Sequence, residues 1–279
     1  DPAINISKIA KKGGVNVYLG NFDMKAANEI EKKYGKFDFI TGSNVFAHID
    51  DIQSVVSAAK NLLKKNGTFM TEVHYLPNLI ELNQYDFIYH EHLNYYTLKS
   101  LITLFTRHGL KVINAEMIPT HGGSIRVSVT PNSKKTVSIK VKKILSLEKN
   151  INRKYFDNFN KNILIQRNQM QEMLKNLISL KKRIVGYGAS GRGTILLNYC
   201  NINTRSIEYI VDESPLRAGK LMPGVKVPIF DIEYFKKDNA NIDYLLVIAW
   251  NYTDAIVKKV KKINKDIKFI IPFPYPHII

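Results

Sequence analysis

A glycine-rich turn in the last third of the chain constrains its fold more than any other feature. Arg183–Tyr187 has the pattern of a buried strand and runs into a G-x-G-x-x-G motif made by Gly186, Gly188 and Gly191. A helical pattern follows, and the next predicted strand, Ile207–Val211, ends in Asp212. A strand, a glycine turn, a helix and a second strand with a terminal acid are typical of a nucleotide-binding unit in a parallel α/β sheet.

The motif suits an anionic ligand for physical reasons. Its first glycine permits a tight turn, its second lets a phosphate approach the backbone, and its third allows close helix packing. The N-terminus of the following helix favours anionic oxygens, and Ser190 and Arg192 add hydrogen-bond donors. We therefore predict a nucleotide diphosphate site here, with Asp212 near a ribose. The alternative is a glycine turn that serves packing alone, and the motif does not choose between NAD and a sugar nucleotide.

The first half of the chain alternates between strand and helix patterns. The predicted strands are Val15–Leu19, Phe37–Thr41, Thr68–Val73, Leu110–Glu116 and Ile125–Thr130. The predicted helices are Met24–Lys33, Asp51–Lys65 and Leu98–His108, and a glycine follows each of them within two residues. Alternating units followed by a pair of strands predict an α/β fold with a mostly parallel sheet covered by helices.

The composition divides the chain into three parts. Residues 1–130 form the first predicted α/β domain, and residues 183–279 form the second, which starts with the glycine-rich turn. Residues 131–182 contain no glycine and carry apolar residues at helical spacing, so they are predicted to form a helical connector.

Charge and cysteine content limit the function classes. The formal net charge of +17 would suit a phosphate-bearing partner. The lysines lie on the predicted solvent faces of helices, however, and no arginine-rich stripe accompanies them, so we predict no nucleic-acid partner. The sequence has no run of about 18 apolar residues, so no membrane span is predicted. The single cysteine, Cys200, excludes a disulfide framework and favours a cytoplasmic setting. The oligomeric state is not fixed by the sequence.

Polar clusters follow several predicted strands of the first domain. They are Asn44-Val45-Phe46-Ala47-His48, then Tyr85-Asp86-Phe87-Ile88-Tyr89-His90-Glu91-His92 followed by Asn94-Tyr95-Tyr96, and Thr120-His121-Gly122-Gly123-Ser124-Ile125-Arg126. Ligands of parallel α/β sheets bind beyond the carboxyl ends of strands, which is where such clusters lie. Histidines beside a carboxylate and a phenol suit proton abstraction, because imidazole titrates near neutral pH. Metal binding by His90, Glu91 and His92 is an alternative, although no spacing fixes a third ligand.

These motifs resemble those of the deoxysugar C-methyltransferases. The resemblance rests on Tyr89-His90-Glu91-His92, on Thr120–Arg126, and on Gly186-Tyr187-Gly188-Ala189 followed by Leu196–Cys200, and it extends over nearly the whole chain. It implies a methyltransferase domain with a Rossmann-like fold that uses S-adenosylmethionine, and a second, C-terminal Rossmann-like domain that holds a nucleotide-linked sugar. A zinc-binding N-terminal module typical of the family is absent, so zinc is not expected in this chain.

The resemblance also implies residue roles. Asp1 looks like the acid that holds the cofactor ribose, and Asn44 is a second expected cofactor-binding residue. The chain is therefore expected to begin just after the main cofactor loop and to bind S-adenosylmethionine weakly or not at all. His92 is the expected base, Tyr89 and Glu91 orient the sugar or polarise its ketone, and His48 hydrogen-bonds one of them. Substrate-binding roles fall to His121, Gly122, Arg126, Gly186, Gly188, Ser190, Gly191, Arg192 and Asp212.

The expected reaction is methylation of a sugar carbon beside a ketone, through base-assisted enolate formation. Two alternatives remain open at this point. An NAD(P)-dependent oxidoreductase would use Gly186–Gly191 and Asp212 but would leave Tyr89–His92 without a role. A catalytically inactive fragment that only binds a nucleotide sugar is the other.

Overall fold

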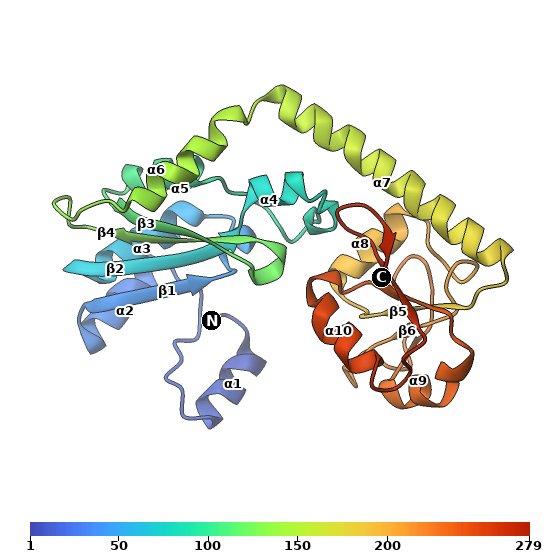
Figure 1. Cartoon of the computed structure of the whole chain (residues 1–279). Helices are drawn as coiled ribbons and strands as arrows, with labels where there is room; N and C mark the ends of the chain where they lie inside the picture. The colour runs from blue at the N-terminus through green and yellow to red at the C-terminus, as the bar shows by residue number, and fades with distance from the viewer. The chain divides into compact units, whose positions relative to one another are not determined.

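The computed structural model describes all 279 residues, which divide into two compact units (Figure 1). Unit 1 comprises Asp1–Pro77 and His90–Asn150, and unit 2 comprises Asn78–Tyr89 and Ile151–Ile279. Each unit has a sheet of its own, with four strands in unit 1 and six in unit 2. No helix of the chain combines the length and the apolar character that a membrane crossing requires.

The sheet of unit 1 has the order β1-β2-β4-β3. Its strands are β1 (Phe37–Ser43), β2 (Leu63–His74), β3 (Lys111–Ile118) and β4 (Ser124–Thr130). The first two run parallel, and β4 is antiparallel to both of its neighbours. The carboxyl ends of β1, β2 and β3 therefore meet the start of β4 at one edge of the sheet. We call this the site edge of unit 1.

The main helices of unit 1 begin where a side chain accepts a hydrogen bond from the first turn. Asp23 caps α2 (Met24–Tyr34), Asp51 caps α3 (Ile52–Leu62), and Thr97 caps α5 (Leu98–Arg107) in a capping box with Ser100. Their apolar faces, with that of α6 (Ile139–Leu147), pack on the sheet. The core includes Val56, Ala59, Phe69, Leu101, Phe105, Val127 and Ile144.

A buried carboxylate joins three elements of this core. Glu148, in the single turn η4 (Glu148–Asn150) that follows α6, accepts hydrogen bonds from the Tyr75 hydroxyl at 2.8 Å and from the backbone N–H groups of Leu98 and Lys99 at 2.5 and 2.9 Å. The two N–H groups belong to the first turn of α5, where backbone N–H groups have no acceptor within the helix. Glu148 thus ties the start of α5 and the end of β2 to the chain after α6.

Two predicted elements of unit 1 differ from the structure. The predicted strand Val15–Leu19 is wrong, because this segment pairs with no strand and instead follows a helix, α1 (Ile4–Lys12), that the sequence analysis did not predict. The predicted helix Asp51–Lys65 is too long, because β2 begins directly at Leu63. Gly67 lies at an irregularity within β2, where a Cβ atom would come 2.9 Å from the Phe37 carbonyl oxygen, so it is a strand glycine and not a helix stop.

The sheet of unit 2 has the order β10-β9-β8-β5-β6-β7, and only β10 runs antiparallel to its neighbour. Its strands are β5 (Ile184–Tyr187), β6 (Ile210–Val211), β7 (Ile229–Phe230), β8 (Tyr244–Val247), β9 (Lys268–Ile271) and β10 (His277–Ile278). The chain runs outward from β5 to β7 and then returns to place β8 on the other side of β5. This reversal is a topological switch point, where open α/β sheets bind ligands beyond the strand ends.

Helices of unit 2 include α7 (Arg153–Ser179), α8 (Gly191–Tyr199), α9 (Ile232–Asp238) and α10 (Thr253–Val260). The predicted strand–turn–helix sequence around the glycine motif is confirmed, because β5 leads directly to α8. Residues predicted as connector carry α6, which belongs to unit 1, and α7, which belongs to unit 2. The shorter helix α4 (Leu76–Glu81) contains the first passage of the chain from unit 1 to unit 2.

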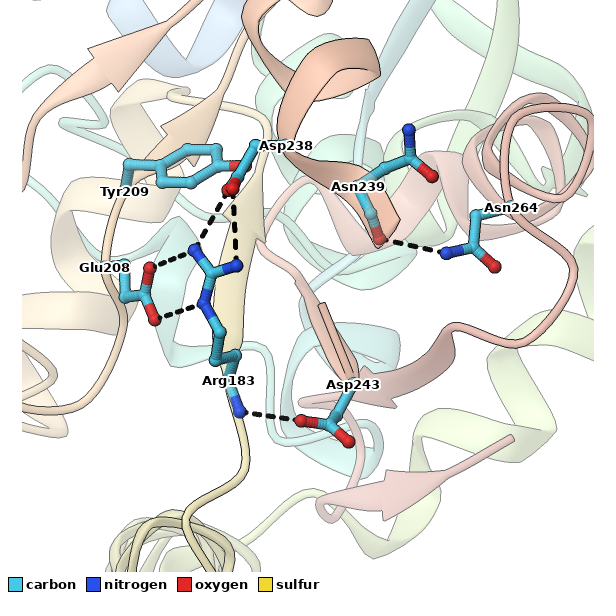
Figure 2. A network of polar contacts seen from close by, with 7 residues as sticks. All are labelled: Arg183, Glu208, Tyr209, Asp238, Asn239, Asp243 and Asn264. Carbon is cyan, nitrogen blue, oxygen red and sulfur yellow. Dashed lines mark hydrogen bonds and ion pairs between the residues drawn. The ribbon is translucent and has the colours of Figure 1, made fainter. Parts of the chain in front are cut away.

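An arginine-centred network closes the amino end of β5 (Figure 2). Arg183 donates to Glu208 at 2.9 and 2.6 Å and to Asp238 at 3.2 and 3.0 Å, and its backbone N–H donates to Asp243 at 2.9 Å. The Tyr209 hydroxyl also donates to Asp238. The network therefore joins the starts of β5, β6 and β8 to the end of α9. It lies at the end of β5 opposite to the glycine-rich turn.

Residues Asn78–Tyr89 form a part of unit 2 that is remote in sequence from the rest of it. We call them the docking segment. The Tyr85 hydroxyl donates to Gln166 Oε1 at 3.0 Å and lies 3.2 Å from Cys200 Sγ, and Asn83 Nδ2 donates to the Pro274 carbonyl at 3.1 Å. The docking segment is thus held by α7, by the end of α8 and by the chain after β9.

Cys200 provides a test of this packing. Its side chain is 1% exposed, and burial raises the pKa of its thiol to about 11 from an ordinary value of 9.0. We expect a thiol reagent at pH 8 to label the native protein about a hundredfold more slowly than the urea-unfolded chain, because labelling requires unit 2 to open. Equal rates in the two states would contradict this packing.

The same pKa shift predicts a pH dependence of stability. The folded state holds the Cys200 proton more tightly than the unfolded chain does. The protonated thiol therefore contributes fully to the free energy of unfolding below pH 9, and this contribution is lost as the pH rises towards 11. Urea titrations of the wild type and of Cys200→Ser between pH 8 and 11 measure the difference between their slopes with pH. Parallel slopes would contradict the assignment.

Candidate functional site

Two of the predicted polar clusters lie at the site edge of unit 1. Asn44 follows β1, and its backbone N–H donates to the Glu72 carbonyl in β2 at 2.8 Å. The turn Thr120–Gly122 precedes β4, and the Gly123 carbonyl accepts the N–H of Tyr75, just after β2, at 3.2 Å. The strand order therefore brings the Asn44–His48 and Thr120–Arg126 clusters to one edge, as parallel α/β sheets do with their ligand sites.

The chain after His90 is fixed to the loop that carries His48. The Leu93 N–H donates to the Ala47 carbonyl at 2.7 Å, and the Tyr96 hydroxyl donates to the Phe46 carbonyl at 3.1 Å. The imidazoles of His48 and His92 lie side by side as a result, with ring centroids 5.0 Å apart and an interplanar angle of 61°. We call these two residues the histidine pair.

One hydrogen bond sets the tautomer of His48. Its Nδ1 lies 3.0 Å from the backbone carbonyl oxygen of Glu91. Because a carbonyl oxygen only accepts, Nδ1 carries the proton, and a neutral His48 has its lone pair on Nε2. The structure thus combines a fixed tautomer with a base of the type that abstracts protons near neutral pH.

Glu91 and Tyr89 flank the histidine pair in sequence. Glu91 uses its backbone carbonyl to hold His48, and its side chain is exposed. Tyr89 is the last residue of the docking segment and belongs to unit 2, and the chain enters unit 1 at His90. The expected hydrogen bond from His48 therefore reaches the backbone of Glu91 and not its carboxylate.

The other cluster of the site edge contains a strained turn and an ion pair. His121 has a left-handed backbone with φ of 56°, and Gly122 follows with φ of 86°. Such backbone strain in a non-glycine residue is concentrated at functional sites. Arg126 donates to the buried carboxylate of Glu72 at 2.9 Å across the β2–β4 pair. Sequence reasoning missed Glu72, whose only signal was an acid within the otherwise apolar end of a predicted strand.

The two expected cofactor-binding residues retain unused polar atoms. Asp1 Oδ1 accepts the N–H of Ala3 at 2.7 Å, which leaves Oδ2 without a hydrogen bond to the chain. Asn44 has φ of 55° and is partly exposed at the end of β1. A carboxylate oxygen and an amide suit the hydroxyl and amino groups of a nucleoside, so the residue types fit S-adenosylmethionine.

The glycine-rich turn separates into packing glycines and one open glycine. A Cβ atom on Gly186 would come 2.6 Å from Ile248 Cδ1, and one on Gly193 would come 2.3 Å from Ile248 Cγ2. Gly188 has φ of +96°, and its Cβ would come 2.4 Å from the Ala249 Cβ. Gly191, at the first position of α8, has no atom within 4 Å of such a Cβ. Packing therefore accounts for three of these glycines, and Gly191 alone faces open space.

The polar residues of the turn maintain its shape. Ser190 Oγ accepts the N–H of Gly193 at 3.0 Å as the N-cap of α8. Asp212 Oδ2 accepts from the Ala189 N–H at 2.7 Å and from Arg217 at 3.0 Å, and its Oδ1 accepts the Ser214 N–H. Asp212 is thus engaged within unit 2 at both carboxylate oxygens. Arg192 is likewise engaged, in contact with the docking segment.

Metal chemistry gains no support from the geometry. No group of three or more His, Cys, Asp or Glu side chains is arranged to hold a metal ion. What the two units offer is a pair of imidazoles and an ion pair at the edge of one sheet, and an open helix N-terminus at the switch point of the other.

Sequence comparisons match both parts of the chain. The family model described as C-methyltransferase C-terminal domain matches residues 119–274, more than half of the chain, and a methyltransferase domain model matches residues 2–115. The C-methyltransferase NovU of Streptomyces niveus is 34% identical over 284 aligned positions, which include all of this chain and 67% of NovU.

Two solved structures show a fainter likeness. An S-adenosylmethionine-dependent methyltransferase from Thermotoga maritima is 17% identical, over 47% of this chain and 72% of that one, with a TM-score of 0.36. Another from Clostridium acetobutylicum is 13% identical, over 48% and 74%, with a TM-score of 0.34. The sequence matches, and not these likenesses, carry the assignment.

Proposed function

The chain belongs to the C-methyltransferase family and is an S-adenosylmethionine-dependent C-methyltransferase; from that premise we propose that it methylates the carbon beside the ketone of a nucleotide-linked keto-deoxysugar. The observation that carries the proposal is the histidine pair, since methylation at carbon requires that a carbon-bound proton be removed first. A C–H bond beside a ketone is acidic enough for imidazole, because the negative charge moves to the ketone oxygen.

His92 takes this proton in the proposed reaction. The electron pair of the C–H bond passes to the enolate of the sugar, whose carbon is then the nucleophile. His48 holds the Glu91 backbone through Nδ1 and lies against the His92 ring, so it restricts the conformations of the segment that carries the base. Glu91 and Tyr89 orient the sugar or polarise its ketone.

The methyl donor is assigned to the two expected cofactor-binding residues of unit 1. Asp1 and Asn44 would hold S-adenosylmethionine, which supplies an electrophilic methyl group when it is bound. His121, Gly122 and Arg126, at the start of β4, bind the substrate in this proposal. The strained His121 backbone supports that role, because it costs free energy that packing alone does not require. The Arg126 side chain pairs with Glu72 and stays partly exposed, so its guanidinium is accessible to a ligand.

Unit 2 binds the nucleotide in this proposal. The diphosphate lies at the N-terminus of α8, beside Gly191, where first-turn N–H groups lack intrahelical acceptors. Gly191 is the glycine of the motif whose absence of a side chain packing does not explain. The position of this turn at the switch point of the sheet supports the same assignment.

The substrate class is tested by offering matched compounds. We expect methyl transfer to carbon with a nucleotide-linked keto-deoxysugar, and a rate constant kcat/KM at least about a hundredfold lower with the same sugar freed from its nucleotide, because remote binding energy lowers the barrier. The nucleotide sugar that carries a hydroxyl in place of the ketone is the control and should not react. A methyl group on oxygen, or equal rates with the free sugar, would overturn the proposal.

A further inference from the structure

The docking segment is held on unit 2 by a buried ion pair. Asp86 Oδ2 accepts from Arg192 Nε at 2.9 Å, lies 2.8 Å from Arg192 Nη2, and accepts from Trp250 Nε1 at 2.9 Å. The side chains of Asp86 and Arg192 are 1% and 15% exposed. One carboxylate oxygen of the docking segment thus contacts both the first turn of α8 and the chain after β8.

Aromatic rings enclose the guanidinium of Arg192. It lies 3.6 Å from the ring centroid of Phe87, which follows Asp86, and 4.7 Å from that of Trp250. Such contacts supplement the ion pair with cation–π attraction and exclude water from it. Arg192 therefore faces the docking segment, although its sequence position beside Gly191 predicted a phosphate ligand.

Each charge of the pair depends on the other. Burial raises the pKa of the Asp86 carboxyl, and the positive charge of Arg192 acts in the opposite direction. Burial lowers the pKa of Arg192, and the negative charge of Asp86 counteracts that shift. The phenols of Tyr89 and Tyr252 also act on the Arg192 charge, so Tyr89 is close enough to feel it. Loss of one partner would leave the other as an uncompensated buried charge.

We infer that Asp86 is a positioning residue: it holds the docking segment against Arg192 and Trp250 and so fixes Tyr89, from which the chain continues into His90-Glu91-His92. The inference rests on the proposed function for its catalytic consequence but not for its structural one. Two residues separate Asp86 from Tyr89, and the ion pair anchors them beside the turn to which we assign the nucleotide. Arg192 thereby contributes to the placement of Tyr89 and not to phosphate binding.

Asp86→Asn tests the inference, since it keeps the shape of the side chain and removes its charge. The matched control is Glu81→Gln, which removes the charge of an exposed carboxylate in the same segment and keeps an acceptor for the Tyr155 hydroxyl. We expect amide hydrogen exchange of residues 85–89 to accelerate about tenfold or more in Asp86→Asn and to stay unchanged in Glu81→Gln. Unchanged exchange in Asp86→Asn would overturn the inference, and this readout requires no substrate.

The catalytic consequence is measured as a split between kcat and KM. In Asp86→Asn we expect kcat for methyl transfer to fall about tenfold or more, with KM for the nucleotide sugar within about threefold, because Tyr89 is misplaced while the nucleotide turn is intact. A merely structural role would lower the amount of folded enzyme and leave kcat per folded molecule unchanged, and that result would overturn the inference. Inactivity of the wild type would instead refute the proposed function, and the exchange result would stand by itself.

Discussion

His92→Asn is expected to reduce proton exchange at the substrate carbon about a hundredfold or more while both ligands still bind. General-base catalysis contributes an acceleration of this order, and asparagine keeps hydrogen-bonding groups but cannot take the proton. The measurement is deuterium wash-in from heavy water into the nucleotide-linked keto-sugar without the methyl donor, followed by NMR. Calorimetry of the same variant checks that nucleotide-sugar affinity is retained.

His48→Asn is the necessary comparison, because the structure also gives His48 a defined basic atom, Nε2. Wash-in that persists in His92→Asn and disappears in His48→Asn would move the base to His48. His277→Asn, at an exposed position in unit 2, should leave the rate unchanged. Retained wash-in in both pair variants would exclude the histidine pair as the source of the base.

The same substitution at two glycines of one turn is expected to lower the stability of unit 2 by very different amounts. Gly188→Val should prevent unit 2 from folding, because a side chain there meets Ala249 and requires a backbone of φ +96°, at a combined cost of about 3 kcal/mol or more. Gly191→Val should fold with a loss of stability below about 1 kcal/mol, since open space surrounds that position. Circular dichroism melting curves measure both.

Ligand binding then separates packing from function. We expect Gly191→Val to weaken the affinity for a nucleoside diphosphate about tenfold or more, because a side chain at the N-terminus of α8 occupies the place of a phosphate. Arg205→Ala is a control that removes a cation of unit 2 remote from the turn in sequence. An unchanged calorimetric affinity in Gly191→Val would show that the turn serves packing alone.

Local sequence patterns predicted the elements better than the contacts between them. The strand–turn–helix around Gly186–Gly193 is confirmed because each of its signals acts within a few residues. The helix before β2 was extended too far because Gly67 looked like a helix stop, whereas it relieves crowding against β1. The segment Val15–Leu19 has an apolar pattern but no partner strand, which no local signal reveals.

The candidate site was predictable in outline for a similar reason. Clusters that follow successive strands were expected to meet, and the sheet order brings Asn44–His48 and Thr120–Arg126 together. The tautomer of His48 depends on a backbone carbonyl 43 residues away, which a sequence pattern does not encode. The roles of the site residues and the limits of the domains stay predictions. Asp86 was absent from the predicted site because its partners, Arg192 and Trp250, lie 106 and 164 residues further on.

The docking segment also has a consequence for the order in which the protein is made. A ribosome must add 106 residues after Asp86 before Arg192 exists, a delay on the order of 5–20 s at ordinary synthesis rates. Throughout that interval the nascent chain carries Tyr85, Asp86 and Phe87 without the surfaces that bury them, whereas all four strands of unit 1 are complete once residue 130 is added. The docking segment can therefore become ordered only after Arg192 and Trp250 have been synthesised. A ribosome-arrested chain that ends near residue 150 should expose this segment to protease.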